Sequence, residues 1–367
     1  MKPRFIISPC GTSILTNGAT EEQRRLCICH ANVRKPEEVS ETDRQVLLSR
    51  IDEVQQKLIG ADVETAAKMS AELNGIITFY SRKVEQKQDF HYLVCTDTWL
   101  GEVTAELVQT WLLDKVTSQV QIYRQKDLRT ANLLEFQFAL SELVGWIDET
   151  VTGYRNSNYQ IVFNLTGGFK SVQGFLQALA NFYADETIYI FENATELLRI
   201  PRMPVRMIVE EEIKNNLQTF RRLAENLPVT EQEVSSIPDI LLLEIDGRYG
   251  FSAWGELQWR QIKDSIYSQE ILPSPSPKIR YGDRFLDSTK GLMTDRYVIL
   301  NCRIDQLACY LERPDQPNPN SLDFKLIKNP YPPSTHEMDA WSDLDAKRLY
   351  GHFEDNVFVL DRLDKHL

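Results

Sequence analysis

One segment of the chain constrains its fold more than any other, because a buried-strand pattern there ends in two glycines and leads directly into an amphipathic helix. The segment is Tyr159-Gln-Ile-Val-Phe-Asn-Leu-Thr-Gly-Gly-Phe-Lys-Ser171. Glycines let the backbone approach a ligand closely, and the free N–H groups of a helix start favour an anion. The spacing fits neither the P-loop, with four residues between its first glycine and Gly-Lys-Ser/Thr, nor the G-x-G-x-x-G dinucleotide fingerprint. The segment therefore predicts a turn that binds an anion other than a nucleotide triphosphate.

Buried strands and amphipathic helices alternate over the first half of the chain. Strand patterns cover residues 4–8, 91–95, 119–123, 159–164, 187–192 and 196–200. Between the first two strands we expect one helix capped by Ser40 and a second capped by Asp62, with an apolar stripe from Met69 to Tyr80. This alternation predicts a Rossmann-like α/β fold, a mostly parallel sheet with flanking helices on both faces. The turns after Ser8, Cys95 and Asn164 should converge at the carboxyl ends of the strands, where such sheets bind ligands.

The character of the sequence changes in the second half. Residues 206–234 read as a charged helical linker, with a helix from about 210 to 225. From residue 235 a strand pattern at 240–245, a Pro/Ser stretch at 272–277 and a helix at 294–311 precede several short strands. Those strands are expected at residues 322–327, 336–341, 347–353 and 357–360. Residues 235–367 are therefore predicted to form a small α+β domain with an antiparallel sheet.

Composition limits the classes of protein to consider. The 367 residues are 42% apolar and 26% charged, as in ordinary soluble globular proteins. No apolar run approaches the roughly 20 residues of a membrane helix, and residues 1–7 enter a strand without a signal-peptide core, so we expect a cytoplasmic protein and no membrane partner. Cys27-Ile-Cys29-His30 lacks a second Cys/His pair, so no metal site is expected. The net charge of −12 argues against a broad basic face for naked nucleic acid.

Two motifs carry a resemblance to a known family. With Ile7-Ser-Pro-Cys-Gly-Thr-Ser-Ile-Leu-Thr-Asn17 and Asn164-Leu-Thr-Gly-Gly-Phe-Lys-Ser171, residues 1–205 resemble a CRISPR-associated Rossmann-fold (CARF) domain. The resemblance implies a homodimer that binds a cyclic oligoadenylate, most simply cyclic tetra-adenylate, across its two-fold axis. An isologous dimer would present each turn twice to a two-fold symmetric ring of phosphates. The implied ligand-binding residues are Thr12, Ser13, Thr166, Gly167, Gly168, Lys170 and Ser171.

One residue does not fit a phosphate site. Asp97 follows the strand at 91–95 and would place a negative charge near the phosphates, unless it caps the following helix instead.

The C-terminal stretch from Ser334 to His366 is similar to the strand core of a RelE-type toxin. That family implies cleavage of mRNA, typically in the ribosomal decoding site, without a metal ion. Together the two halves resemble a CARF–RelE effector of type III CRISPR systems. The resemblance implies an endoribonuclease that is activated by cyclic tetra-adenylate, needs no cofactor, has mRNA and the ribosome as partners, and does not bind DNA.

Metal-free RNA cleavage needs a base, an acid and cations for the developing phosphorane charge. Seven basic residues near the C-terminus are candidates for these roles: His336, Lys347, Arg348, His352, Arg362, Lys365 and His366. Strand alternation predicts that Arg348, Tyr350 and His352 share one face, with Lys347 on the other. We assign phosphate binding to Arg348, because a guanidinium can bind two phosphate oxygens in one plane. His352 and His366 are the candidates for proton transfer.

Other interpretations stay open. The basic residues can instead form ordinary surface ion pairs with Asp343, Asp345, Asp361 or Asp364. The N-terminal domain can itself cleave the cyclic oligoadenylate, with Lys170 stabilising the phosphate and Ser13 or Ser171 orienting the attacked linkage. The chain can also be a ligand-responsive regulator without chemistry, although no helix-turn-helix pattern follows residue 235.

Overall fold

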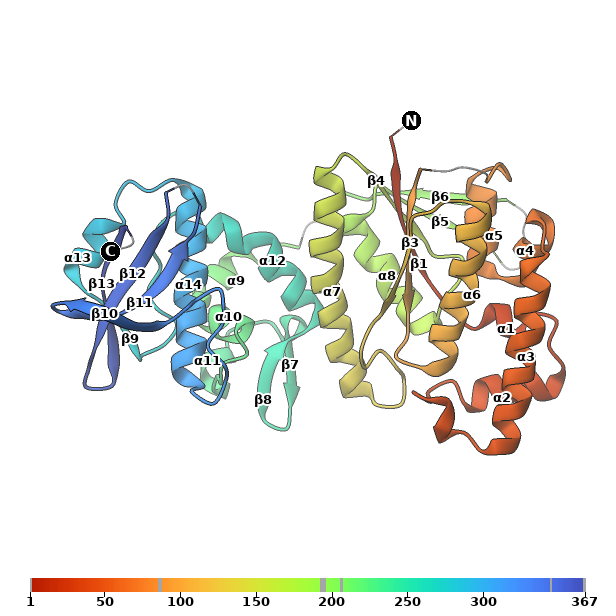
Figure 1. Ribbon diagram of the computed structural model, residues 1–367, viewed down its shortest axis with the longest axis horizontal. Helices are drawn as coiled ribbons and strands as arrows, with labels where there is room; N and C mark the ends of the chain where they lie inside the picture. Colours follow the sequence, from red (N-terminus) through yellow and green to blue (C-terminus); the bar gives the residue numbers. More distant parts are fainter. Residues whose placement is uncertain (1, 85–87, 192–195, 205–206, 344, 366–367) are drawn as a thin grey trace. The chain divides into compact units, whose positions relative to one another are not determined.

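The computed structural model describes residues 2–84, 88–191, 196–204, 207–343 and 345–365. The chain divides into two compact units, Met1–Arg206 and Met207–Leu367, coloured red to green and green to blue in Figure 1. No helix among the described residues has the length and apolar character that crossing a membrane requires.

A six-stranded sheet forms the centre of the first unit, and its strand order is β3-β2-β1-β4-β5-β6. All neighbouring strands run parallel except β5 and β6, which are antiparallel. This arrangement confirms the predicted mostly parallel α/β sheet. The strands are β1 (Arg4–Pro9), β2 (Phe90–Cys95), β3 (Val120–Arg124), β4 (Gln160–Asn164), β5 (Glu186–Tyr189) and β6 (Leu198–Pro201).

Helices cover both faces of this sheet, as the alternation predicts (Figure 1). On one face, α7 (Leu133–Asn156) brings Tyr154 onto Phe5, with the two rings stacked at a centroid distance of 4.0 Å. The same face receives α8 (Lys170–Tyr183). The remaining helices of the unit are α1 (Ser13–Thr16), α2 (Glu21–Cys29), η1 (Pro36–Glu38), α3 (Glu41–Ile59), α4 (Val63–Met69), α5 (Ala71–Phe79) and α6 (Trp99–Lys115).

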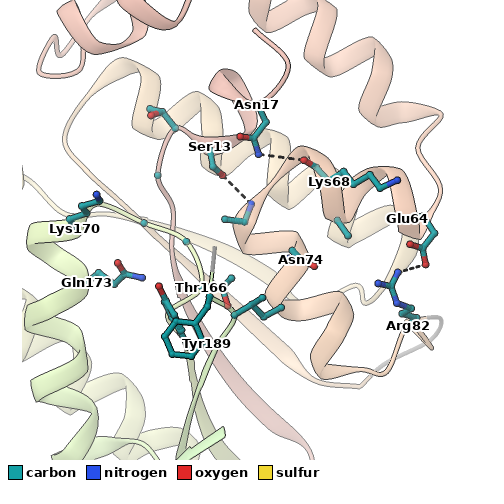
Figure 2. A pocket seen from close by; sticks show the side chains of 18 residues that line it. Ser13, Asn17, Glu64, Lys68, Asn74, Arg82, Thr166, Lys170, Gln173 and Tyr189 are labelled. Atoms are coloured by element: carbon teal, nitrogen blue, oxygen red, sulfur yellow. Dashed lines mark hydrogen bonds and ion pairs between the residues drawn. The ribbon is translucent and has the colours of Figure 1, made fainter. Parts of the chain in front are cut away.

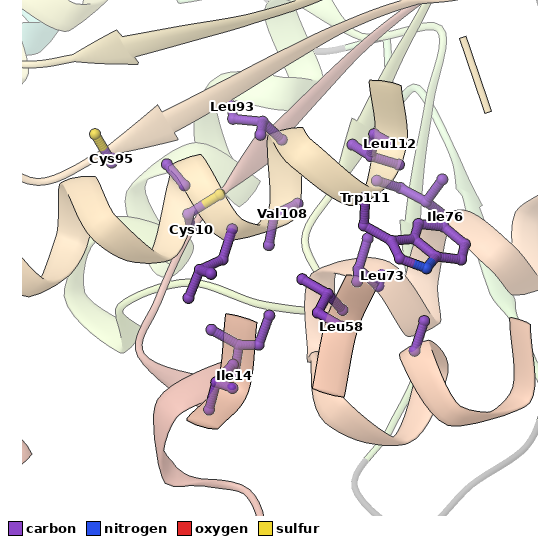
Figure 3. Packing of buried hydrophobic residues seen from close by; sticks show 14 of the residues in the cluster. Cys10, Ile14, Leu58, Leu73, Ile76, Leu93, Cys95, Val108, Trp111 and Leu112 are labelled. Atoms are coloured by element: carbon purple, nitrogen blue, oxygen red, sulfur yellow. The ribbon is translucent and has the colours of Figure 1, made fainter. Parts of the chain in front are cut away.

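The main core of the first unit lies between the other sheet face and these remaining helices (Figure 3). Leu93 of β2 and Val108 of α6 are completely buried in it. Trp111, also buried, donates from its indole nitrogen to the carbonyl oxygen of Ala61 at 3.3 Å, so its one polar group is satisfied. A core that includes both sheet and helix side chains fixes the strand ends, and with them the turns that follow β1 and β4.

One predicted helix is divided in the structure. The segment capped by Asp62 forms α4, and Ser70 ends it and caps a second helix, α5, by accepting the N–H of Leu73 at 3.2 Å. A serine hydroxyl competes with helical bonding and favours a cap, which explains the break. The break turns Glu72 toward the β1 and β4 turns.

His91 lies fully buried on β2. Its Nε2 lies 3.0 Å from the hydroxyl of Tyr80, which in turn donates to Asp89 at 2.8 Å. Its Nδ1 has no hydrogen-bond partner among the described residues. Burial lowers the pKa of His91 from 6.5 to about 3, because a proton on Nδ1 would place an unsolvated charge in the core.

This burial predicts a pH-dependent stability of the first unit. The unfolded state binds a proton on His91 below about pH 6.5, whereas the folded state binds it only near pH 3. The free energy of unfolding is therefore independent of His91 above pH 6.5 and decreases as the pH falls between these two values. We expect the thermal unfolding midpoint to fall between pH 7 and pH 5 and to fall less in a His91→Gln variant. Equal pH slopes for the two proteins would contradict this assignment.

The second unit is built on a five-stranded sheet of order β10-β11-β12-β13-β9. Four of its strands are antiparallel, as predicted, and β9 adds a parallel edge to β13 that the sequence analysis does not anticipate. The strands are β9 (Ile279–Tyr281), β10 (Lys325–Tyr331), β11 (Ser334–Trp341), β12 (Lys347–Glu354) and β13 (Val357–Lys365). A separate hairpin joins β7 (Leu242–Ile245) and β8 (Arg248–Phe251).

Helices in this unit pack on the sheet and on one another. The helices are α9 (Glu210–Asn215), α10 (Leu217–Ala224), α11 (Glu231–Val234), η2 (Asp239–Leu241), α12 (Ala253–Tyr267), α13 (Asp283–Ser288) and α14 (Thr294–Glu312). Residues 206–234, interpreted as a linker from the sequence, contribute buried Ile213, Phe220 and Leu223 to a core shared with α12. The expected helix at 210–225 is divided at Asn216, where α9 ends.

Candidate functional site

Two turns meet where the strand order of the first unit reverses. β1 lies between β2 and β4, so the crossovers that leave β1 and β4 diverge to opposite sides of the sheet. Such a switch point opens a crevice at the carboxyl ends of the strands. A cavity of about 820 Å³ is present there, lined by residues 11–13 after β1 and by residues 166–168 after β4.

Six of the seven predicted ligand-binding residues line this cavity, as Figure 2 shows for the labelled Ser13, Thr166 and Lys170. They are Thr12, Ser13, Thr166, Gly167, Gly168 and Lys170. Ser171 is the exception, because it follows Lys170 on α8 and consecutive helical residues point about 100° apart. Ser171 lines a separate small hollow together with Thr96 and Thr98, so the turn after β2 does not join the main cavity either.

The residues that complete the cavity are not predicted from the sequence pattern. The further polar side chains in its lining are Asn17, Glu64, Lys68, Asn74, Arg82, Gln173 and Tyr189. Most come from α4 and α5 or their ends, which the helical pattern presents only as a packing stripe. Gln173 is the residue of this set that local sequence could have indicated, because it lies three positions after Lys170 and so on the same side of α8.

Cations border the cavity on two sides (Figure 2). Lys170, the first residue of α8, and Lys68 on α4 are both exposed, and neither ammonium group has a partner among the described residues. Arg82 is different, because its guanidinium is paired with Glu64. The two lysines therefore give the cavity an attraction for anions.

A buried carboxylate lies beneath the two turns. Glu72 of α5 has no exposed surface, and its Oε1 accepts the N–H of Gly11 at 2.9 Å and the N–H of Gly168 at 3.1 Å. Its Oε2 accepts the hydroxyls of Ser13 at 2.8 Å and of Ser70 at 2.7 Å. The N–H of Gly168 is thus occupied by an internal anion, and the turn holds less free donor capacity than the sequence predicts.

The glycine of the β4 turn is required by this carboxylate. A Cβ on Gly167 would lie 2.2 Å from Oε1 of Glu72 and 2.6 Å from its Cγ, so any side chain there would displace Glu72. Gly168 has a φ of +107°, a conformation that side chains rarely adopt. The Gly-Gly pair therefore lets the turn close over Glu72.

Asp97 does not cap the helix after β2, because Thr98 accepts the N–H of Gly101 in that role. Arg34 lies 3.0 Å from Asp97 Oδ2, and Arg124 donates to Oδ1 at 3.0 Å. Partial burial alone would raise the pKa of Asp97, but the N–H of Asp127 and the Arg124 guanidinium outweigh it and lower the pKa. The charge that looked unfavourable beside phosphates is thus neutralised within the protein.

In the second unit, Arg348, Tyr350 and His352 project from β12 on the face opposite the core residue Leu349, as alternation predicts. Arg348 is held there by acids: it pairs with Glu337, with Asp339 at 3.3 Å and with Asp323 at 3.7 Å. These partners come from β11 and the segment before β10, not from the aspartates considered from the sequence. Arg348 could bind a phosphate only if the phosphate replaced these carboxylates as its ionic partner.

His352 is better placed for proton transfer. Its Nδ1 lies 3.0 Å from both carboxylate oxygens of Asp361, which also accepts the hydroxyl of Ser334 at 2.8 Å. Nε2 of His352 has no hydrogen-bond partner in the described part of the chain, and the side chain is 21% exposed. On the same face, the guanidinium of Arg362 lies 5.2 Å from the ring centre of Tyr350.

The other basic candidates lie elsewhere. His336 stacks on Phe324 at 5.2 Å on the core side of the sheet, and burial lowers its pKa. The ammonium group of Lys347 lies 5.9 Å from the ring centre of Trp341. Lys365 of β13 is opposite Lys347 in the strand register. His366 lies outside the described residues. The structure therefore brings Arg348, His352 and Arg362 to one face and does not bring His336 and Lys347 to it.

The two cysteines and the histidine of the segment 27–30 lie in different environments. Cys27 is buried and Cys29 exposed, while His30 lies 3.0 Å from Asp43. In the ranges that the structure describes, no three or more His, Cys, Asp or Glu residues are grouped so that they could hold a metal ion.

Comparison with known proteins relates part of the chain to a protein family. No curated protein matches the chain. Residues 67–203 match the family model described as CRISPR-associated protein (Cas_APE2256). This range covers α5, β2 to β6 and the turn at 165–169, and so includes Lys170 of the cavity and Glu72 beneath the turns. Over residues 67–203, the first unit is therefore similar to the CRISPR-associated protein family Cas_APE2256.

Proposed function

We propose that the first unit is a receptor for a cyclic oligoadenylate, most simply cyclic tetra-adenylate. The observation that carries this proposal is the cavity at the switch point, which gathers both motif turns with Lys68 and Lys170. Its volume of about 820 Å³ is within the range of roughly 300–1,000 Å³ that is common for ligand pockets. The family match to a CRISPR-associated protein supports a ligand of antiviral signalling.

The chemistry of the lining fits a phosphodiester ring with adenosine groups. Each phosphodiester carries one negative charge, and the two unpaired lysines can neutralise such charges, while Asn74, Gln173 and the hydroxyls can bond sugars and bases. A homodimer would present two such cavities to one symmetric ring. The proposal therefore includes a two-fold dimer in which each protomer binds half of the ligand.

Lys170→Ala should weaken binding of cyclic tetra-adenylate at least tenfold, or about 1.4 kcal/mol, through loss of a charge-assisted contact. Ser171→Ala is the matched control, because Ser171 is adjacent in sequence but lines a different hollow, and its affinity should stay unchanged. Isothermal titration calorimetry measures both. An unchanged affinity of the Lys170 variant would remove this residue from the site.

For the second unit, we propose a metal-independent endoribonuclease of the RelE type that cleaves mRNA on the ribosome in type III CRISPR defence. The supporting observation is one face of β12 and β13, where Asp361 holds His352 and which also carries Arg348 and Arg362. A histidine with one nitrogen held by a carboxylate and the other free has the arrangement of a general acid or base. The nucleotide would act as the allosteric activator.

A ring nuclease in the first unit is the second candidate, and one observation favours it. The hydroxyl of Ser13 is bonded to a buried carboxylate and faces the cavity, so a polarised oxygen lies where a ligand linkage would bind. Incubation with labelled mRNA, with programmed ribosomes and with labelled cyclic tetra-adenylate separates the candidates by which substrate is cleaved. Cleavage of none of them would favour a ligand-responsive regulator without chemistry.

A further inference from the structure

The hydrogen bonds of Ser13 leave it with a defined polarity. A serine hydroxyl has one hydrogen to donate and two lone pairs to accept. The hydrogen is donated to Oε2 of Glu72 at 2.8 Å, and one lone pair accepts the N–H of Ala71 at 3.1 Å, drawn as a dashed line in Figure 2. Only a lone pair remains for the cavity that Ser13 lines.

Glu72 enforces this polarity. Its carboxylate is fully buried and can only accept, and each of its oxygens receives two hydrogen bonds. If Ser13 turned its hydrogen toward the cavity, Oε2 would lose one of its two donors in a buried setting. Losing one of the four hydrogen bonds to a fully buried carboxylate costs more than a hydrogen bond at the exposed cavity surface returns, so the hydrogen stays on Glu72.

We propose that Glu72 is a positioning residue that fixes Ser13 as a hydrogen-bond acceptor, so that Ser13 contacts a donor group of the ligand and not a phosphate oxygen. A phosphodiester has no hydrogen to donate. In a cyclic oligoadenylate the donors are the ribose 2′-hydroxyl and the adenine 6-amino group. This inference rests on the proposed receptor function and assigns Ser13 to ligand discrimination, where the sequence motif alone suggested phosphate binding.

Wild-type protein tests the inference directly. Calorimetry compares cyclic tetra-adenylate with two analogues, one lacking the 2′-hydroxyls and one with purine in place of adenine. We expect one analogue to bind about tenfold more weakly, and the weaker one identifies the donor that Ser13 accepts. Equal affinity of all three rings would overturn the inference, while no binding of cyclic tetra-adenylate itself would instead overturn the receptor function.

Glu72→Gln reverses the polarity without changing the shape of the side chain. The N–H groups of Gly11 and Gly168 require an oxygen at the Oε1 position, so the amide nitrogen must take the Oε2 position and donate to Ser13. Ser13 then accepts two bonds within the protein and points its own hydrogen at the cavity. The tenfold discrimination between the native ring and the weaker analogue should fall to about twofold or less.

The control is Glu53→Gln, the same charge change on α3 at a residue outside the cavity lining, which should retain the wild-type discrimination. Thermal unfolding verifies that both variants are folded. Retained tenfold discrimination in folded Glu72→Gln protein would show that Glu72 does not set the polarity of Ser13 and would overturn its assigned role.

Discussion

Replacing Asp305 by alanine is expected to lower the free energy of unfolding of the second unit by about 3–5 kcal/mol. Asp305 on α14 and Arg221 on α10 are 2% and 1% exposed and form an ion pair with an N–O distance of 2.6 Å. Tyr267 also donates its hydroxyl to Asp305; burial and the nearby carboxylate raise the pKa of Tyr267, so the donor stays protonated. Without Asp305, the Arg221 guanidinium would remain buried and without an ionic partner.

Urea unfolding followed by tryptophan fluorescence measures this loss, because Trp254 and Trp259 lie in the same unit. The matched control is Glu210→Ala, which breaks the exposed pair with Lys214 and should leave the free energy of unfolding nearly unchanged. Replacing both members of the buried pair, as in Arg221→Met with Asp305→Leu, should recover much of the loss, since no buried charge remains. A loss below 1 kcal/mol for Asp305→Ala would mean that water reaches the pair.

The buried ion pair makes α10 a structural element of the second unit. Arg221 also donates to the carbonyl oxygen of Pro273, and Arg222 donates to that of Pro275 at 2.8 Å and pairs with Glu312. The Pro/Ser stretch at 272–277 is thus held to α10. Neither partner is predictable from sequence, because the contacts join residues about 50 and 90 positions apart.

Local signals predicted the elements of the fold well. Ser40 and Asp62 cap α3 and α4 as expected, since a cap depends on a few neighbouring residues. The buried runs at 4–8 and 159–164 become β1 and β4, and their turns meet because parallel strands end at the same edge. The position of the cavity at these strand ends therefore follows from the strand pattern and the turn chemistry, although its lining from α4 and α5 does not.

The polarity of the site could not be predicted in this way. Glu72 is one of many glutamates in helical segments, and only the break at Ser70 and the packing of α5 against both turns bury it. Likewise, the acids that hold Arg348 depend on the register that places Asp339 opposite it. A one-residue change of register would present different partners, and sequence patterns do not specify register to that degree.

In the second unit, His352→Ala is expected to lower the rate of ribosome-dependent mRNA cleavage by about 100- to 10,000-fold, the usual contribution of a general acid or base. Asp361 accepts at Nδ1 and so places the free Nε2 toward solvent, where it can take a proton from a 2′-hydroxyl or give one to the leaving oxygen. Binding of cyclic tetra-adenylate, which we propose for the other unit, should be unchanged.

The matched control for this prediction is His336→Phe, which keeps an aromatic ring against Phe324 on the core side of the sheet and should retain cleavage. The assay follows labelled mRNA on ribosomes in EDTA, with and without cyclic tetra-adenylate. Products should end in a 2′,3′-cyclic phosphate or a 3′-phosphate, as attack by the 2′-hydroxyl demands. If His352→Ala cleaves at the wild-type rate while His336→Phe does not, the reacting face is the core side of the sheet and not the face that carries His352 and Asp361.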